Sequence, residues 1–194
     1  MWWGMVRMPF IQLSEADVVA LREVAMQSIR HGLTHAGALA VNAADFAASL
    51  QPRRATFVTL HQHGALRGCI GTLLAQQPLV QDVAKQAYAA AFQDPRFPAL
   101  EAQEVDSITL EISILTPPEI FPVDSEADLI AQVRPGVDGL VLESGPFRGT
   151  FLPAVWAQLP EPEVFVQHLK LKAGLPSAGW PAEITVLRYQ AQKI

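Results

Sequence analysis

Hydrophobic side chains recur at helical spacing in several stretches of the chain. In the first stretch, apolar residues lie three or four positions apart from Val18 to Ile29, after Ser14 and before Gly32. A serine at this place can cap the first turn of a helix, and a glycine can end the last turn. The pattern therefore predicts a helix over residues 15–31. Similar patterns predict further helices at residues 42–50, 78–92, 126–134 and 162–173.

Alternation of hydrophobic and polar residues marks the predicted strands. It is most regular from Ile108 to Ile114, so one face of this strand is apolar and the other polar. Two extended runs, 55–60 and 65–73, flank the turn residues 62–64 and predict a β-hairpin. Further strands are expected at residues 137–142, 147–152 and 183–189.

Strands joined by hairpins and interrupted by helices favour an α+β fold over a regular βαβ fold. We expect a mainly antiparallel sheet flanked by helices. The chain has 194 residues, of which 50% are hydrophobic, enough for one sizeable core. No repeat and no stretch long enough to be a linker interrupts it. The sequence therefore predicts a single domain over residues 1–194.

The amino-acid composition limits the classes of function and the cellular compartment that we expect for the protein. The net charge is −5, which argues against nucleic-acid binding because phosphates require a basic face. The single cysteine, Cys69, excludes an intrachain disulfide and fits a reducing compartment. Residues 1–10 show no secretion signal, and no apolar run approaches the ~20 residues of a membrane span. We expect a cytoplasmic protein that binds neither nucleic acid nor membrane.

The candidate chemistry lies on the second strand of the predicted hairpin. Side chains alternate along a strand, so Arg67 and Cys69 point to one face while Leu66 and Ile70 point to the core. A nearby arginine favours the nucleophilic thiolate form of a cysteine, and it can also bind a carboxylate or phosphate. The alternative is structural, because a lone cysteine is often a small apolar filler of the core.

Two glycines, Gly68 and Gly71, flank the cysteine on the same strand. Without side-chain bulk they allow another group to approach the backbone closely. Their backbone N–H groups are candidate donors to an anionic substrate. The segment therefore predicts a thiol, a guanidinium and open backbone at one place.

Two histidines near the hairpin turn raise the question of a metal. His61 and His63 share a face if the first strand continues through the turn, and Cys69 lies on the neighbouring strand. A site with two imidazoles and one thiolate is one interpretation, and a solvated turn with two ordinary histidines is the other. No carboxylate or second thiol completes the set, so we assign no metal site. The sequence leaves the cofactor unknown.

Four other charged residues are candidates for substrate binding. Asp94 and Arg96 either form an ion pair that fixes their loop or line a pocket. Glu111 lies on the polar face of the most regular strand, where it faces solvent or a pocket. Arg148 is a further candidate anion contact.

Taken together, the segment Phe57–Leu60, the turn at Gly64 and the segment Leu66–Gly71 resemble the hallmark of the AMMECR family. The resemblance covers residues 46–189 and implies an α+β domain with a larger and a smaller subdomain and a cleft between them. Downstream segments of the family pattern follow in the expected order: Asp94–Phe97, Leu110–Glu119, Asp138–Leu140, Leu152–Val155 and Lys172–Leu175.

The resemblance also implies partners. Bacterial and archaeal members are similar to the A component of the AmmeMemoRadiSam system, which also contains a Memo-like protein and a radical SAM protein. The chain departs from the family pattern at Lys170, where many relatives have a cysteine, and at Asp138, where some have histidine. If those residues bind a metal in relatives, this chain lacks part of that site.

Two hypotheses of function follow. In the first, the protein is an enzyme in which Cys69 is the nucleophile or redox thiol and Arg67 tunes it. Backbone N–H groups near Gly68 and Gly71 then hold a small anionic substrate. In the second, the same place is a non-catalytic binding site for an acidic metabolite or for a partner such as the Memo-like protein. Nucleic-acid binding ranks below both because of the charge.

Overall fold

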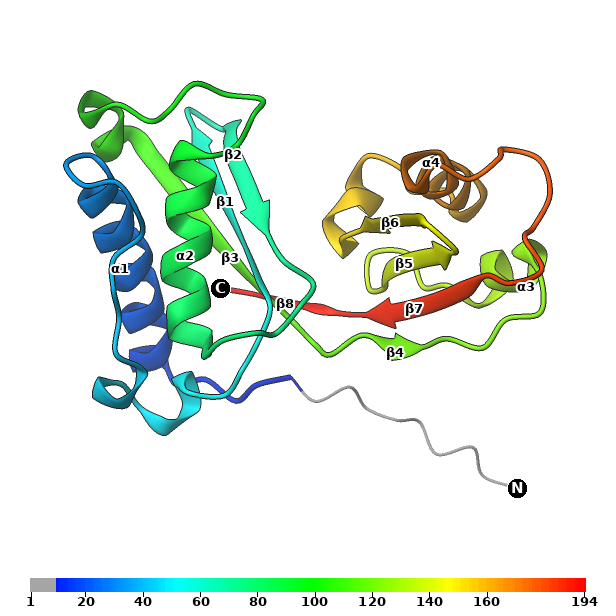
Figure 1. Cartoon of the computed structure of the whole chain (residues 1–194), viewed down its shortest axis with the longest axis horizontal. Coiled ribbons are helices and arrows are strands. Elements are labelled where there is room, and N and C mark those ends of the chain that lie inside the picture. The colour runs from blue at the N-terminus through cyan, green and yellow to red at the C-terminus, as the bar shows by residue number, and fades with distance from the viewer. Residues whose placement is uncertain (1–9) are drawn as a thin grey trace. The chain divides into compact units, whose positions relative to one another are not determined.

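The computed structural model describes residues 10–194, in which the chain divides into two compact units (Figure 1). The larger unit contains residues 10–117 and 192–194, and the smaller unit contains residues 118–191. The single-domain assignment stays a prediction. The expectation that no secretion signal is present concerns residues 1–10, of which 1–9 lie outside the described residues. Within residues 10–194, no helix combines the length and the apolar character that a membrane crossing needs.

The larger unit is a four-stranded sheet with two helices on one face (Figure 1). Helix α2 packs on β1 and β2, and α1 packs against α2. The strands in spatial order are β2 (Ala65–Gly71), β1 (Thr56–Gln62), β3 (Ile108–Leu115) and β8 (Ala191–Lys193). The helices are α1 (Glu15–Gly32), α2 (Leu79–Phe92) and the short 3-10 helices Ala43–Asp45, Ala48–Leu50 and Ala102–Ser107.

Alternation along the strands explains which face the helices cover. Val58 of β1 and Ile112 of β3 are fully buried and share one core with the alanine-rich side of α2. The small side chains of α2 allow the helix to lie close to the sheet. The hydroxyl of Ser28 in α1 donates to the carbonyl oxygen of Ala84 in α2 at 2.7 Å, which ties the two helices together. The opposite face of the sheet carries the polar side chains.

The smaller unit has its own sheet and its own core. Phe165 of α4 is fully buried and stacks on Trp156, with 3.7 Å between the ring centroids. Helix α4 ends at Gly174, whose left-handed backbone (φ 81°) accounts for the glycine there. The strands in spatial order are β4 (Glu119–Ile120), β7 (Thr185–Tyr189), β5 (Gly139–Ser144) and β6 (Phe147–Phe151). The helices are α3 (Glu126–Gln132), α4 (Pro162–Ala173) and the 3-10 helix Pro153–Ala157.

The structure confirms the α+β class and the antiparallel pairing of the hairpin. The expected helix over residues 42–50 is wrong, because the chain forms two separate 3-10 turns there. Phe46 between them is extended and packs against the core, so a tertiary contact outweighs the local helical pattern. Strands β4 and β8 are too short for an alternation of hydrophobic and polar residues to predict them.

Lys170 in α4 is fully buried although lysine is rarely found inside a protein. Its Nζ donates to the carboxylate of Glu126 at 2.7 Å and to the carbonyl oxygens of Ser177 and Gly179 at 3.1 and 2.8 Å. All three N–H donors of the ammonium therefore have acceptors. The lysine joins α4 to α3 and to the loop that follows α4.

We expect Lys170→Met to lower the free energy of unfolding by about 3 kcal/mol, because it leaves Glu126 and two carbonyl oxygens without their donor. Urea denaturation followed by circular dichroism measures the change. Lys172→Met is the matched control: it lies two residues along on an exposed side of the same helix and should change stability by less than about 1 kcal/mol. Equal effects of the two variants would contradict the prediction.

Candidate functional site

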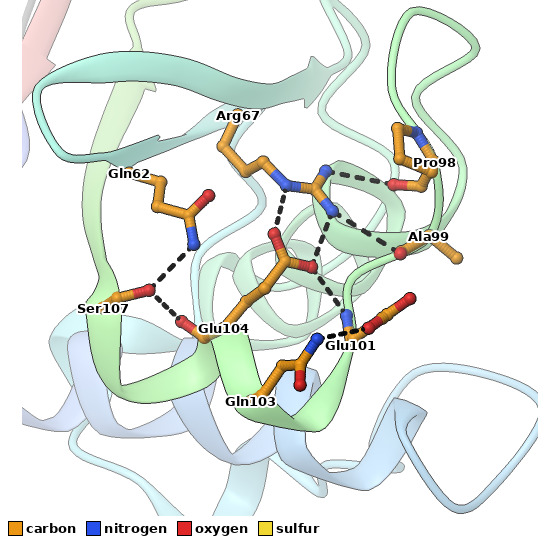
Figure 2. Close-up of polar contacts among 8 residues, drawn as sticks. All are labelled: Gln62, Arg67, Pro98, Ala99, Glu101, Gln103, Glu104 and Ser107. Atoms are coloured by element: carbon orange, nitrogen blue, oxygen red, sulfur yellow. Dashed lines mark hydrogen bonds and ion pairs between the residues drawn. The ribbon is translucent and has the colours of Figure 1, made fainter.

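Arg67 is buried at the outer edge of the larger unit's sheet, with 8% of its surface exposed. Figure 2 shows its guanidinium directed at the carboxylate of Glu104 in the 3-10 helix before β3. Nε and Nη2 donate to the two carboxylate oxygens at 2.8 and 2.9 Å. Nη1 and Nη2 also donate to the carbonyl oxygens of Pro98 and Ala99 at 3.0 and 3.5 Å. The Arg67 side chain thus links the loop that follows α2 to strand β2.

This placement of Arg67 results from a β-bulge. Leu60 pairs with Gly68 and His61 pairs with Leu66, so Arg67 has no residue opposite it on β1. The extra residue interrupts the alternation of faces. Leu66, which we expected in the core, is therefore 41% exposed, and that prediction is wrong. Ile70, beyond the bulge, packs against the core as expected.

The electrostatic consequence is a strongly stabilised ion pair. The hydrogen bonds that Arg67 donates to Glu104 raise the pKa of Arg67 and lower the pKa of Glu104. The guanidinium already makes four hydrogen bonds inside the protein. Its contacts are therefore those of a structural clamp. The predicted role of Arg67 as the group that activates Cys69 stays a prediction, and these contacts do not favour it.

Cys69 is half-buried on β2, and the groups that contact it come from two other segments. The hydroxyl of Thr59 on β1 donates to its sulfur at 3.3 Å. Its backbone N–H donates to the carboxylate of Asp94 at 2.8 Å, and its carbonyl oxygen accepts from Arg96 Nη2 at 3.2 Å. Asp94 and Arg96 thus bind the two backbone groups that β2 presents at its open edge.

Asp94 and Arg96 form the predicted ion pair, and it is asymmetric. The side chain of Asp94 is 2% exposed and that of Arg96 is 54% exposed. The guanidinium donates to both carboxylate oxygens, at 2.9 and 2.7 Å. These bonds, together with the Cys69 N–H, hold the pKa of Asp94 well below its usual range. Asp94, and to a smaller extent the Cys69 side chain, raise the pKa of Arg96. Arg96 therefore brings an exposed cation into contact with the backbone of Cys69.

The two glycines of the segment serve internal packing. A Cβ atom at Gly68 would collide with the carbonyl oxygen of Ala90 in α2. One at Gly71 would collide with the ring of Phe57 and the carbonyl oxygen of Thr56. At both positions the protein itself fills the space that a side chain would occupy. The assignment of the two glycines to substrate binding stays a prediction, and these contacts do not favour it.

One row of side chains crosses the polar face of the sheet. Thr59 lies opposite Cys69 on one side and opposite Glu111 on the other, so all three point to the same face. Glu111 pairs with Lys193 of β8 at 3.0 Å. The structure therefore brings Glu111 onto the face of Cys69, two strands away. Thr59 and Lys193 were missed as site residues because the local sequence does not show which residues lie opposite them on the neighbouring strands.

The remaining candidates are not members of this row. Arg148 belongs to the smaller unit, where it pairs with Glu143 across the β5–β6 hairpin at 2.7 Å. His63 lies in the turn with a left-handed backbone (φ 52°), so β1 does not continue through it as the shared face would require. Among residues 10–194, no group of three or more His, Cys, Asp or Glu side chains is arranged to hold a metal ion.

Comparison with known proteins identifies relatives over most of the chain. The AMMECR1 family model matches residues 22–194. A protein of Methanothermobacter thermautotrophicus is 44% identical over 142 residues, which cover 72% of this chain and 74% of that protein. Protein MJ0810 of Methanocaldococcus jannaschii is 42% identical over 144 residues, 72% of each chain. The crystal structure of the uncharacterised protein PH0010 from Pyrococcus horikoshii matches with a TM-score of 0.80 and 31% identity, covering 89% of this chain and 88% of that one.

The packing of Gly68 gives a direct stability test. We expect Gly68→Ala to lower the free energy of unfolding by about 3 kcal/mol, because the new methyl group meets backbone of α2 that cannot move aside. Leu66→Ala, two residues away and exposed, should cost less than about 1 kcal/mol. Thermal and urea unfolding of both variants measure the difference. A Gly68→Ala variant as stable as the parent would refute the close contact between Gly68 and the backbone of Ala90.

The ion pair at Asp94 predicts a pH dependence. Because the pKa of Asp94 is lowered in the folded state, the unfolded chain binds more protons than the folded chain below about pH 4. The stability that Asp94 contributes is present above that pH and is lost as the pH falls. We expect Asp94→Asn to cost about 2 kcal/mol at pH 7. The difference from the parent protein should shrink between about pH 4 and 2 in urea titrations. A difference that stays constant with pH would contradict the prediction.

Proposed function

The chain belongs to the AMMECR1 family, and from this premise we propose that it is a thiol-dependent enzyme acting on a small anionic substrate at Cys69. The observation that supports the proposal is the half-buried thiol beside the half-exposed guanidinium of Arg96. In this proposal Arg96 takes the part that the sequence assigned to Arg67. Arg67 holds the loop from which Arg96 projects.

The proposed roles follow from the contacts. The Arg96 guanidinium attracts the anionic group of the substrate, since its planar N–H groups fit a carboxylate or phosphate. After the thiol loses its proton to water, the sulfur donates an electron pair to an electrophilic carbon and an S–C bond forms. The leaving group departs with the electrons of the bond that breaks. Thr59, whose hydroxyl donates to the sulfur, orients it. Glu111, on the same face, is near enough to contact a substrate that spans two strands.

A non-catalytic binding site is the second candidate. It is favoured by Arg96, whose exposed guanidinium can bind an anion without any reaction at the thiol. Such a protein would act with others, and the Memo-like and radical SAM proteins are the proposed partners. Pull-down of this chain with either partner protein tests the binding role. The role predicts that the Cys69→Ser variant still binds the partner and that the Arg96→Gln variant does not. Partner binding by the Arg96→Gln variant would count against the binding role.

Alkylation of the thiol tests the enzyme proposal, because Cys69 is the only cysteine in the chain. Iodoacetate carries a negative charge and iodoacetamide does not, so the ratio of their rates reports the cation beside the sulfur. We expect Arg96→Gln to lower this ratio about two- to fivefold, the effect of one partly solvated charge. The mass that alkylation adds should be absent from the Cys69→Ser variant, which confirms that Cys69 is the labelled residue.

Arg148→Gln is the matched control for this experiment. Arg148 is also half-exposed, with 48% of its side chain accessible, and also pairs with a carboxylate. Its replacement should leave the ratio of the two rates unchanged. Two results would refute the proposal: a native protein whose thiol reacts with neither reagent, and a ratio that is the same in Arg96→Gln as in the parent.

A further inference from the structure

The pairing of β1 with β2 brings the side chain of Thr59 close to the sulfur of Cys69. The backbone N–H of Cys69 bonds to Asp94 and its carbonyl oxygen to Arg96, so neither group is directed at β1. Thr59 and Cys69 lie opposite each other and are therefore a non-hydrogen-bonded pair of the ladder. In such a pair the Cα atoms are only about 4.5 Å apart, and the side chains are closer than in the hydrogen-bonded pairs.

The other neighbour of Thr59 is Glu111 on β3, and there the pairing is of the opposite kind. The N–H and C=O of Thr59 are directed at β3, because they are not directed at β2. Thr59 and Glu111 therefore form a hydrogen-bonded pair, with Cα atoms about 5.5 Å apart. The hydroxyl of Thr59 has one proton to donate, and it donates that proton to the sulfur of Cys69 at 3.3 Å.

This hydrogen bond distinguishes the two protonation states of the sulfur. A neutral thiol is a weak acceptor, whereas a thiolate carries a negative charge and accepts strongly. A donor that bonds more strongly to the charged form favours that form. Threonine is β-branched and has a restricted χ1 angle, so the hydroxyl is held toward the sulfur with little further loss of side-chain freedom.

We propose that Thr59 is a catalytic residue that stabilises the thiolate of Cys69 and so raises the reactivity of the sulfur near neutral pH. This inference rests on the thiol-dependent activity proposed above and adds to it the group that favours the charged sulfur. The thiol proton passes to water, and the hydroxyl keeps its own proton. The sulfur retains the electron pair that attacks the substrate.

The pH profile of alkylation by iodoacetamide tests the proposal. This reagent is neutral, so its rate does not depend on the attraction of an anion by Arg96. The thiolate sulfur displaces iodide, and the rate therefore follows the fraction of thiolate. Thr59→Val removes the donor and keeps the branched shape of the side chain. We expect the rate at pH 7 to fall about two- to fivefold in this variant, because a hydrogen bond to a charged group is lost.

The difference between Thr59→Val and the parent should disappear at high pH. Above about pH 10 the sulfur is ionised in both proteins, so the donor no longer changes the fraction of thiolate. The variant should then react as fast as the parent or slightly faster, because a more basic thiolate is a better nucleophile. A change in access to the sulfur would instead alter the rate equally at all pH values.

Three further variants complete the experiment. Thr59→Ser retains a hydroxyl and should restore most of the rate that Thr59→Val loses. Thr59→Ala removes the same donor with a smaller side chain and should match Thr59→Val. Thr109→Val is the control, since Thr109 lies on the same face of the sheet but opposite His61, and it should react as the parent does. Charged or titratable side chains of the segments around Cys69 are the same in every variant: His61, Arg67, Asp94, Arg96 and Glu111.

Three results would overturn the proposal. They are an unchanged pH profile in Thr59→Val, a loss of rate in that variant that is as large at pH 10 as at pH 7, and a Thr59→Ser variant as slow as Thr59→Val. The enzyme proposal fails by a different result, a ratio of iodoacetate to iodoacetamide rates that Arg96→Gln leaves unchanged. The two failures are therefore distinguishable.

Discussion

Two arginine–carboxylate pairs hold the edge of β2, and the position of the candidate site depends on them. β2 is the outermost strand of its sheet, so its outward backbone groups have no strand to bond. At Cys69 the carboxylate of Asp94 accepts from the N–H, and the guanidinium of Arg96 donates to the carbonyl oxygen. A neighbouring strand would supply the same donor and acceptor. Side chains from one loop thus close the edge and keep the thiol half-accessible.

The Arg67–Glu104 pair has a different physical character because it is almost completely buried. A buried guanidinium is tolerated only when its donors are satisfied, and here a bidentate carboxylate and two carbonyl oxygens meet that condition. The β-bulge at Arg67 is what turns the side chain toward this loop. The contacts of Arg67 are thus those of a structural clamp, and the arginine that contacts the backbone of Cys69 comes from the loop after α2.

Lys170 shows how a buried cation is accommodated. At this position the chain carries a long cation inside the smaller unit. The ammonium has three acceptors, one of them a carboxylate, so its charge is compensated where it lies. The position acts in this chain as a link between α3, α4 and the following loop.

The sequence by itself determined the elements and the class of the fold. Periodicity predicted α1, α2, α4 and the β1–β2 hairpin, because long amphipathic stretches carry a strong local signal. It also identified Cys69 and the Asp94–Arg96 pair. Only the tertiary structure decided which groups surround the thiol. The bulge at Arg67, the donor from Thr59, the alignment of Glu111 with Cys69 and the close packing at Gly68 all depend on strand register and helix position. Register and packing are set by contacts between residues far apart in the chain, and no local pattern encodes them.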